Sequence, residues 1–287
     1  MTLAPPRGFS RAQLEEEAPD SGEQLAAPGH VAFPGSSTRA SRMRSQRFEL
    51  KYWIPDRLAE RVLAFAAPYV ERDAHSATRA SQRNTTLYLD SRGFHFFESH
   101  EALAPDRAKL RIRAYGQPLG ALGFLEVKRK LKSGTHKSRC SLPLAQVENV
   151  LGGRRLSCCL PEDTRPAFGD FMFRMHVHRA QPQLYIGCFR EAFESRIPGE
   201  DVRLTIDREL VYQAASGARF DPDPARWLAL RDAGDARPVF GRRPAMLELK
   251  FDGSAPRWMV ELVRCFNLQR EAYSKYVAAV RQLRGRT

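Results

Sequence analysis

KLRIRAY, residues 109–115, alternates cationic and apolar residues without a break. Successive side chains of a β-strand point to opposite faces of a sheet, so this stretch predicts a strand with one apolar face. The opposite face carries three successive cations, Lys109, Arg111 and Arg113, before Tyr115. An ordinary solvated face mixes uncharged polar residues with its cations, so a face with three successive cations indicates a special use.

The same period-two alternation occurs in other short segments of the chain, which is the pattern of half-buried strands. Three of these segments contain Glu-x-Lys, beginning at Glu49, Glu126 and Glu248. We expect about eight strands, over Gln46–Trp53, Thr85–Asp90, Lys109–Tyr115, Phe124–Lys130, Thr135–Leu142, Leu184–Glu191, Val202–Leu210 and Met246–Phe251.

Helical patterns separate some of these strands. We expect helices over residues 56–69, 144–151 and 258–266, and a last helix that Ser274 caps. The apolar faces of the strands need cover, and amphipathic helices can provide it. The sequence therefore predicts an α+β fold, a closed antiparallel β-barrel of about eight strands with helices packed outside and charges inside.

The charge of the chain indicates what such a barrel would hold. Its 287 residues carry a formal net charge of +13, which favours a polyanionic partner. About ten cations inside one barrel would repel each other by several kcal/mol per close pair at an effective dielectric constant of ~20. The fold tolerates this only with anions bound along the barrel, and the planar fork of Arg suits phosphate.

The few carboxylates on the cationic faces have two interpretations. In a phosphate site, a Glu that is not paired with a cation can hold a divalent metal that bridges phosphate oxygens. Each Glu can instead neutralise its neighbouring Lys. Both interpretations stay open for Glu49 and Glu126, whereas the metal is favoured for Glu248. We take Glu248 and Glu126 as the candidate metal ligands.

In their order along the chain, these segments resemble the VTC (vacuolar transporter chaperone) domain. This domain is the polyphosphate polymerase branch of the triphosphate tunnel metalloenzymes, the CYTH-like superfamily. The resemblance covers roughly residues 46–280. It rests on Arg47–Ile54, Leu87–Asp90, Lys109–Tyr115, Glu126–Lys130, Leu204–Asp207, Leu247–Phe251 and Ser274–Tyr276.

The resemblance implies a tunnel that transfers the γ-phosphoryl group of ATP onto inorganic polyphosphate, with Mn²⁺ or Mg²⁺. By motif, Lys137 or Arg139 would join the phosphate ligands, Ser274 would add a hydrogen bond and Glu248 would hold the metal. The main phosphate ligands would be Lys51, Arg111, Arg113, Lys128, Arg190, Arg203, Lys250 and Lys275.

Two positions depart from related patterns. The family usually has a Tyr two residues before Arg190, where this chain has Cys188, so one hydrogen-bond donor to phosphate is missing. Triphosphatases of the superfamily often open with Glu-x-Glu-x-Lys, whereas this chain has Arg47 before Glu49 and Lys51. Losing that carboxylate weakens a second metal site that could activate water, which favours transfer over hydrolysis.

The rest of the sequence sets the expected context. Residues 1–45, rich in Ala, Pro, Gly, Ser and Glu, predict a flexible arm before a domain over residues 46–287. The five cysteines include no CxxC pair, which argues against a disulfide scaffold or structural zinc and favours the cytoplasm. No apolar run predicts a signal peptide or membrane span, so coupling to a membrane would need a membrane-protein partner. His176 and His178 are expected on an extended segment as surface histidines.

Three other functions compete with the polymerase. A triphosphatase or a cyclase would use the same fold, and a non-catalytic domain would bind polyphosphate or nucleic acid. Nucleic-acid binding more often interleaves cations with exposed aromatic residues, whereas the aromatic residues here lie largely on the apolar side of the pattern. We therefore expect ATP and inorganic polyphosphate as partners, and no nucleic acid.

Overall fold

The computed structural model describes residues 47–74, 81–132, 134–156, 158–230 and 244–285. Within these ranges the chain builds one antiparallel sheet of ten strands with helices on both of its faces. The arm expected over residues 1–45 lies outside the described residues.

Eight strands form the path of the sheet, in the order β1-β10-β8-β7-β3-β4-β5-β6. All eight predicted strands are confirmed, and two short ones were not predicted, β2 (Val70–Arg72) on β7 and β9 (Leu228–Ala229) on β8. The path consists of β1 (Arg47–Pro55), β3 (Gln82–Asp90), β4 (Arg107–Tyr115), β5 (Leu122–Leu131), β6 (Gly134–Pro143), β7 (Gln181–Ser195), β8 (Arg203–Ala214) and β10 (Pro244–Asp252).

The four predicted helices are present as α1 (Asp56–Ala66), α3 (Leu144–Leu151), α5 (Arg257–Cys265) and α6 (Lys275–Arg284). The sequence missed α2 (His95–Glu101) and α4 (Arg165–Val177). Apolar residues occur on several sides of α4, which hides the helical period. The expected extended segment at His176 is therefore wrong, because His176 lies in the last turn of α4 and His178 follows it.

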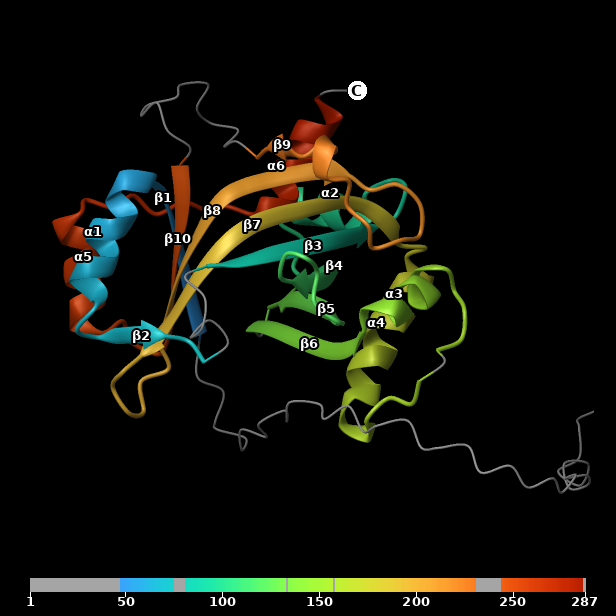
Figure 1. The fold of residues 1–287 in the computed structure, drawn as a ribbon, viewed down its shortest axis with the longest axis horizontal. Helices are drawn as coiled ribbons and strands as arrows, with labels where there is room; N and C mark the ends of the chain where they lie inside the picture. Colours follow the sequence, from blue (N-terminus) through green and yellow to red (C-terminus); the bar gives the residue numbers. More distant parts are fainter. Residues whose placement is uncertain (1–46, 75–80, 133, 157, 231–243, 286–287) are drawn as a thin grey trace, which may run out of the picture. The chain divides into compact units, whose positions relative to one another are not determined.

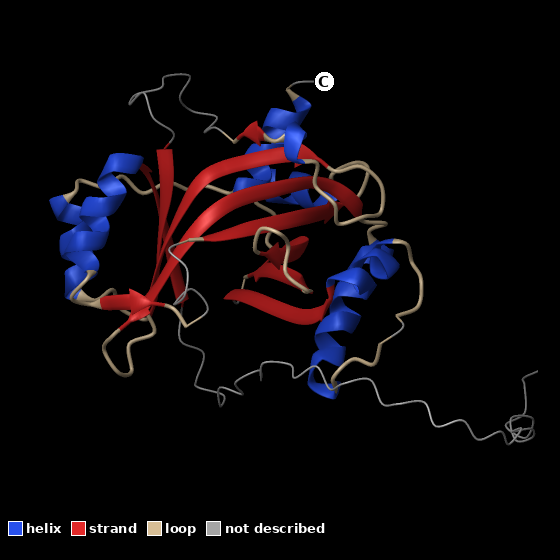
Figure 2. Cartoon of the chain, in the orientation of Figure 1, coloured by secondary structure: helices blue, strands red, loops and turns tan. Residues whose placement is uncertain are grey.

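Helices cover the convex face of the sheet in two separate groups (Figures 1 and 2). At one end, α1 and α5 pack on β1, β8 and β10, where Val62 and Leu262 meet Leu204 and Leu249. At the other end, α3 and α4 pack on β4, β5 and β6. The apolar residues of the strands thus face outward under helices, as the alternation predicts.

A third group of apolar residues lies on the concave face. Helix α6 packs there through Tyr276 and Val280 against Tyr88, Ile186 and Met246, and α2 adds Phe97. The sequence placed all helices outside the barrel, so the position of α6 is a correction. Its contacts make one end of the concave face apolar and leave charged side chains on the rest.

Irregular pairing bends the sheet. The register between β7 and β8 shifts between Gly187 and Phe189, and Glu209 in β8 has a positive φ of 48°. Such bulges increase local twist and reverse which side chains face inward. Ile206 accordingly packs on the convex side, whereas Tyr212 packs against α6 on the concave side.

The sheet is a curled half-barrel. Its path ends at β1 and β6, and no backbone pairing joins these two strands within the described residues. The closed barrel expected from the sequence is thus not formed by hydrogen bonds around a full circle. Alternation reports which side chains share a face, whereas closure depends on strand tilt and stagger, which alternation does not encode.

The convex core generates a stability prediction. Leu249 is fully buried and is paired with Leu50 and Leu204 across the neighbouring strands. Leu249→Ala should lower the free energy of unfolding by about 2–5 kcal/mol, because it leaves a cavity that β1 and β8 cannot fill. Urea denaturation measures this change. The control is Val260→Ala, because the Val260 side chain of α5 is exposed. An equal loss of unfolding free energy in both variants would contradict this packing.

Candidate functional site

Charged side chains from seven strands gather on the concave face. Strand register places these side chains on one side, since Lys51 lies opposite Glu248, Arg190 opposite Asp207, and Arg111 opposite Glu126. All of the predicted phosphate ligands lie on this concave face, with Lys275 contributed by α6. They are Lys51, Arg111, Arg113, Lys128, Lys137, Arg139, Arg190, Arg203, Lys250, Lys275 and Ser274.

Glu126 anchors the cations of β4 and β6. Its side chain is 1% exposed, and its two oxygens lie 2.7 Å from Arg111 Nε and 2.9 Å from Lys137 Nζ. Arg113 and Arg139 approach to 3.6 and 3.7 Å. Burial opposes ionisation of Glu126, but these cations outweigh it and hold its pKa far below the usual value. Both Glu126 oxygens thus lie close to cations, and its role as a metal ligand stays a prediction.

Asp207 anchors cations of β7 and α6 on the other half of the face. It is fully buried and accepts a forked pair of bonds from Arg190, with Nε–Oδ1 at 2.6 Å and Nη2–Oδ2 at 2.7 Å. Lys275 from α6 bonds to the same carboxylate. Burial raises the pKa of Asp207, but Arg190 and Lys275 lower it further than burial raises it. The sequence placed Asp207 in the expected strand Val202–Leu210 and gave it no role.

Glu248 and Glu49 form a carboxylate pair between β10 and β1. Glu248 Oε2 lies 2.7 Å from Lys250 Nζ, and Glu49 Oε1 lies 3.0 Å from Lys51 Nζ. Burial and the neighbouring Glu248 carboxylate both oppose ionisation of Glu49, yet Lys51 and Lys250 prevail and its pKa is lowered. The pKa of Glu248 is also held well below the usual value, because Lys250 and Lys51 outweigh its burial.

This pair is the part of the face that fits a divalent metal. Mg²⁺ is usually bound by one or two carboxylates together with substrate phosphates, rather than by a complete cage of protein ligands. Glu248 and Glu49 supply two carboxylates of this kind. No described cluster of three or more His, Cys, Asp or Glu side chains could hold a metal without such help. A metal here would therefore depend on phosphate oxygens for the rest of its ligands.

Lys109 is a further member of the site that the motif comparison did not assign. Its Nζ donates a 2.8 Å hydrogen bond to Ser274 Oγ. Burial, followed by the charges of Lys51, Lys128 and Arg111, holds the pKa of Lys109 well below the usual value. The alternation in residues 109–115 already placed it beside Arg111, which was the available signal.

One ion pair and one side-chain hydrogen bond connect β1 across the open side of the half-barrel. Glu49 Oε2 on β1 lies 3.2 Å from Lys128 Nζ on β5. Lys51 Nζ donates to the carbonyl of Tyr273, just before α6, at 3.0 Å. These contacts join the first strand to the far side of the sheet and to the segment that leads into α6.

A chain of contacts through Tyr88, Tyr276 and Asp90 orients Arg111. Arg111 donates to Tyr88 Oη at 3.2 Å, and the Tyr88 ring stacks on Tyr276 with centroids 4.7 Å apart. The Tyr276 hydroxyl donates to fully buried Asp90, which also accepts from the backbone N–H of Phe97 at 3.0 Å. Arg111 is therefore positioned by residues on β3, α6 and α2.

Two details bear on anion binding. Arg113 Nε is buried and has no hydrogen-bond acceptor among the described residues, so it is a donor available to a bound anion. Cys188 is buried beside Ile186 in the apolar group under α6. Burial, followed by the charge of Asp207, raises the pKa of its thiol to about 11. The Cys188 thiol therefore stays protonated at neutral pH.

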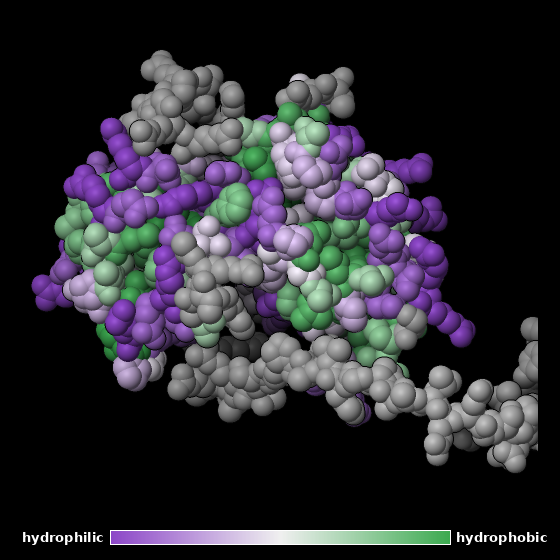
Figure 3. Space-filling view, viewed as in Figure 1, coloured by the Kyte–Doolittle hydropathy of each residue, from purple (hydrophilic) through white to green (hydrophobic). Residues whose placement is uncertain are grey.

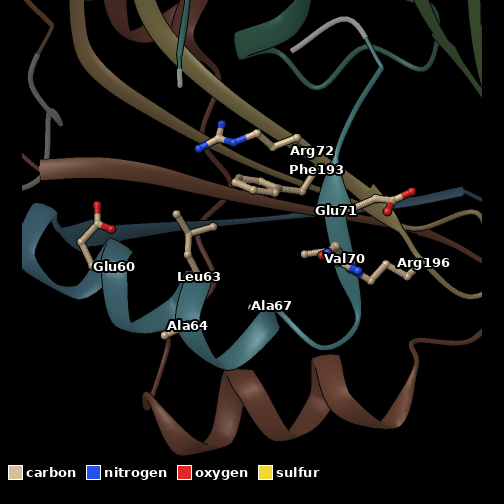
Figure 4. Close-up of a pocket in the computed structure, with 9 residues that line it drawn as sticks. All are labelled: Glu60, Leu63, Ala64, Ala67, Val70, Glu71, Arg72, Phe193 and Arg196. Carbon is tan, nitrogen blue, oxygen red and sulfur yellow. Dashed lines mark hydrogen bonds between the residues drawn. The ribbon is translucent and has the colours of Figure 1, made fainter. Parts of the chain in front are cut away.

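A surface hollow elsewhere does not compete with this site. It lies between α1, β2 and β7, and Leu63, Val70 and Phe193 form its apolar part (Figure 4). Its charged neighbours are engaged, because Arg196 donates to the Val70 carbonyl and Glu60 pairs with Arg208. On the face in Figure 3, hydrophobic patches are small and lie among hydrophilic residues.

The fold and the site together define a curled antiparallel sheet whose concave face carries many cationic side chains. The family model described as the VTC domain matches residues 46–284. The chain therefore belongs to the VTC domain family, which confirms the resemblance.

Solved structures resemble the chain only distantly. A "putative adenylate cyclase" of Bacillus halodurans is 10% identical with a TM-score of 0.45, covering 80% of this chain and 94% of that one. A protein of Pyrococcus horikoshii is 12% identical with a TM-score of 0.41, covering 83% and 98%. A "putative adenylate cyclase" of Vibrio parahaemolyticus has the same identity and TM-score, covering 82% and 98%. No curated protein matches significantly. None of the described helices has the length and apolarity needed to cross a membrane.

The buried carboxylate at Asp207 predicts a pH dependence. Its folded-state pKa is lowered, so its stabilisation is complete above the unfolded value of about 3.9 and disappears as the pH falls through the acid range. Asp207→Asn should cost about 3–5 kcal/mol at pH 7, because Arg190 and Lys275 lose their partner. It should also flatten the loss of stability between pH 7 and pH 3.

Urea denaturation at several pH values measures both effects. Asp106→Asn is the matched control, since Asp106 makes an exposed ion pair with Arg129 and should change stability by at most about 1 kcal/mol. Equal pH profiles for wild type and Asp207→Asn would show that this carboxylate does not stabilise the fold.

Proposed function

We propose that this protein is a metal-dependent polyphosphate polymerase, which transfers the γ-phosphoryl group of ATP onto a growing inorganic polyphosphate chain. The observation that carries the proposal is the cationic concave face beside the Glu49–Glu248 carboxylate pair. Membership of the VTC domain family supports the same activity.

The arrangement of the cations supports a phosphate chain as ligand. They come from successive strands, so they form a row along the face rather than a single point. Arg side chains offer planar forks to phosphate oxygens, and Lys side chains add mobile charges. The buried Arg113 Nε supplies a donor that the protein itself does not satisfy. A linear polyanion can contact many such groups at once.

The electrostatics also support transfer to phosphate rather than to water. Phosphoryl transfer depends mainly on alignment and on stabilisation of charge at the transferred group, which Arg111, Arg113 and Lys128 can provide. A phosphate acceptor is already ionised and needs no base. Water does need one, and Glu49 and Glu248 have lowered pKa values that make them weak bases.

The metal proposal rests on Glu248 with Glu49. A bound Mn²⁺ or Mg²⁺ would neutralise charge on the β- and γ-phosphate oxygens. Lys250 and Lys51, which now contact these carboxylates, would then be released towards phosphate. This proposal adds Glu49 to Glu248 and Glu126, the two metal ligands predicted from the sequence.

The proposal also includes a closed tunnel and a cytoplasmic location. A polyanion lying along the concave face would draw the cations of β1 and β5 together, where Glu49 and Lys128 already meet. Cytoplasmic ATP would supply the reaction. Delivery of the product across a membrane would need another protein.

A product assay separates the polymerase from its relatives. Incubation with ATP and Mn²⁺ should yield ADP and polyphosphate, which gel electrophoresis and ³¹P NMR detect through the signal of internal phosphates. Orthophosphate without polymer would instead identify a triphosphatase. Cyclic AMP with pyrophosphate would identify a cyclase, and either result would overturn the polymerase.

Glu248→Gln tests the metal ligand. We expect the rate of metal-dependent synthesis to fall about 100-fold or more, because the neutral amide binds a divalent cation poorly. Binding of tripolyphosphate without metal, measured by calorimetry, should persist. Glu101→Gln, which removes one partner of an exposed ion pair with Arg281, should leave synthesis unchanged. Full activity of Glu248→Gln would remove this residue from metal binding.

A further inference from the structure

Ser274 and Lys109 form a hydroxyl–amine pair inside the cationic face. Ser274 Oγ lies 2.8 Å from Lys109 Nζ, although the two residues are 165 positions apart. The hydroxyl also caps α6 by accepting from the backbone N–H of Val277 at 3.3 Å. Ser274 is half-buried and therefore within reach of a ligand on the concave face.

Burial and the surrounding cations lower the pKa of Lys109. Lys51 on β1, Lys128 on β5 and Arg111 on β4 repel its proton, and Glu49 is the main charge that holds it. A charged Lys109 donates to Ser274, whereas a neutral amine can accept the Ser274 proton. A Ser beside a basic Lys is a recognised arrangement for activating a hydroxyl nucleophile.

We propose that Ser274 is the first phosphoryl acceptor of this protein, with Lys109 as its base. Ser274 Oγ attacks the γ-phosphorus of a bound nucleoside triphosphate, and the bond from that phosphorus to the β–γ bridging oxygen breaks. The nucleoside diphosphate leaves with the bonding electrons, and the hydroxyl proton passes to Lys109 Nζ. The resulting phosphoserine starts the chain. This inference rests on the proposed polymerase activity and adds how synthesis begins without a primer.

The location can stabilise the product. A phosphoserine at position 274 would lie at the N-terminal end of α6, where free backbone N–H groups and the helix dipole favour negative charge. Lys51, Lys109 and Lys128 would surround it. Lys51 also holds the preceding segment in place through the Tyr273 carbonyl. A phosphate there would be the next acceptor and would need no base of its own.

Peptide mapping by mass spectrometry tests the acceptor. Wild-type protein is mixed with substoichiometric ATP and Mn²⁺, quenched in acid and digested. We expect phosphate on Ser274. Ser274→Asn should lose the modification and keep α6 folded, since Asn caps helices as well as Ser. Ser274→Thr, which keeps a hydroxyl, should retain it. Lys109→Met should slow labelling about 100-fold or more. Ser254→Ala, in the exposed turn before α5, is the control.

A second measurement distinguishes initiation from a structural role. Without primer, Ser274→Asn should make little polymer from ATP. Added tripolyphosphate should raise its synthesis at least tenfold above the unprimed level, because elongation does not need the missing hydroxyl as acceptor. Failure of tripolyphosphate to restore synthesis would mean that Ser274 acts in elongation or folding, and would overturn the initiation role.

The outcomes also separate this inference from the proposed function. Polymer formation by wild type with no phosphate on Ser274 would overturn the acceptor and leave the polymerase intact. Phosphate on Ser274 without any polymer would support the acceptor and overturn the polymerase. The absence of both products would overturn both.

Discussion

Crowding of like charges on one face of a curved sheet is the constraint on which the rest of this structure depends. Buried carboxylates relieve it, and each one joins several elements. Glu126 connects cations of β4 and β6, Asp207 connects β7 with α6, and Glu248 connects β10 with β1. These carboxylates hold the cations in place without neutralising all of them. The remaining positive charge is what the proposed function uses to bind a polyanion.

The faces of the strands were predictable because side-chain period and sheet geometry are directly related. Lys109 and Asp207 both stood on the predicted cationic faces, although only their partners in space reveal what they do. The curl was not predictable. It depends on register shifts such as the one near Cys188, and a one-residue bulge leaves no clear mark in an alternating sequence.

The three Glu-x-Lys carboxylates show what the sequence alone does not determine. Glu49, Glu126 and Glu248 occur in the same short motif, so the chain alone does not distinguish them. Strand order adds a difference, because β6 places Lys137 and Arg139 near Glu126, whereas Glu49 on β1 lies diagonally across from Glu248 on β10. A carboxylate surrounded by cations acts as an anchor. A pair of adjacent carboxylates can share a divalent ion.

Helix α6 covers one end of the cationic concave face with apolar side chains. Tyr276 and Val280 pack against the strands there. Next to them, Trp53 and Tyr273 make an edge-to-face contact. A linear molecule that runs along this face would meet these apolar side chains at one end. It must enter and leave by the same opening or slip sideways through the seam between β1 and β6. The nucleotide would therefore come in by the same route through which the polymer goes out.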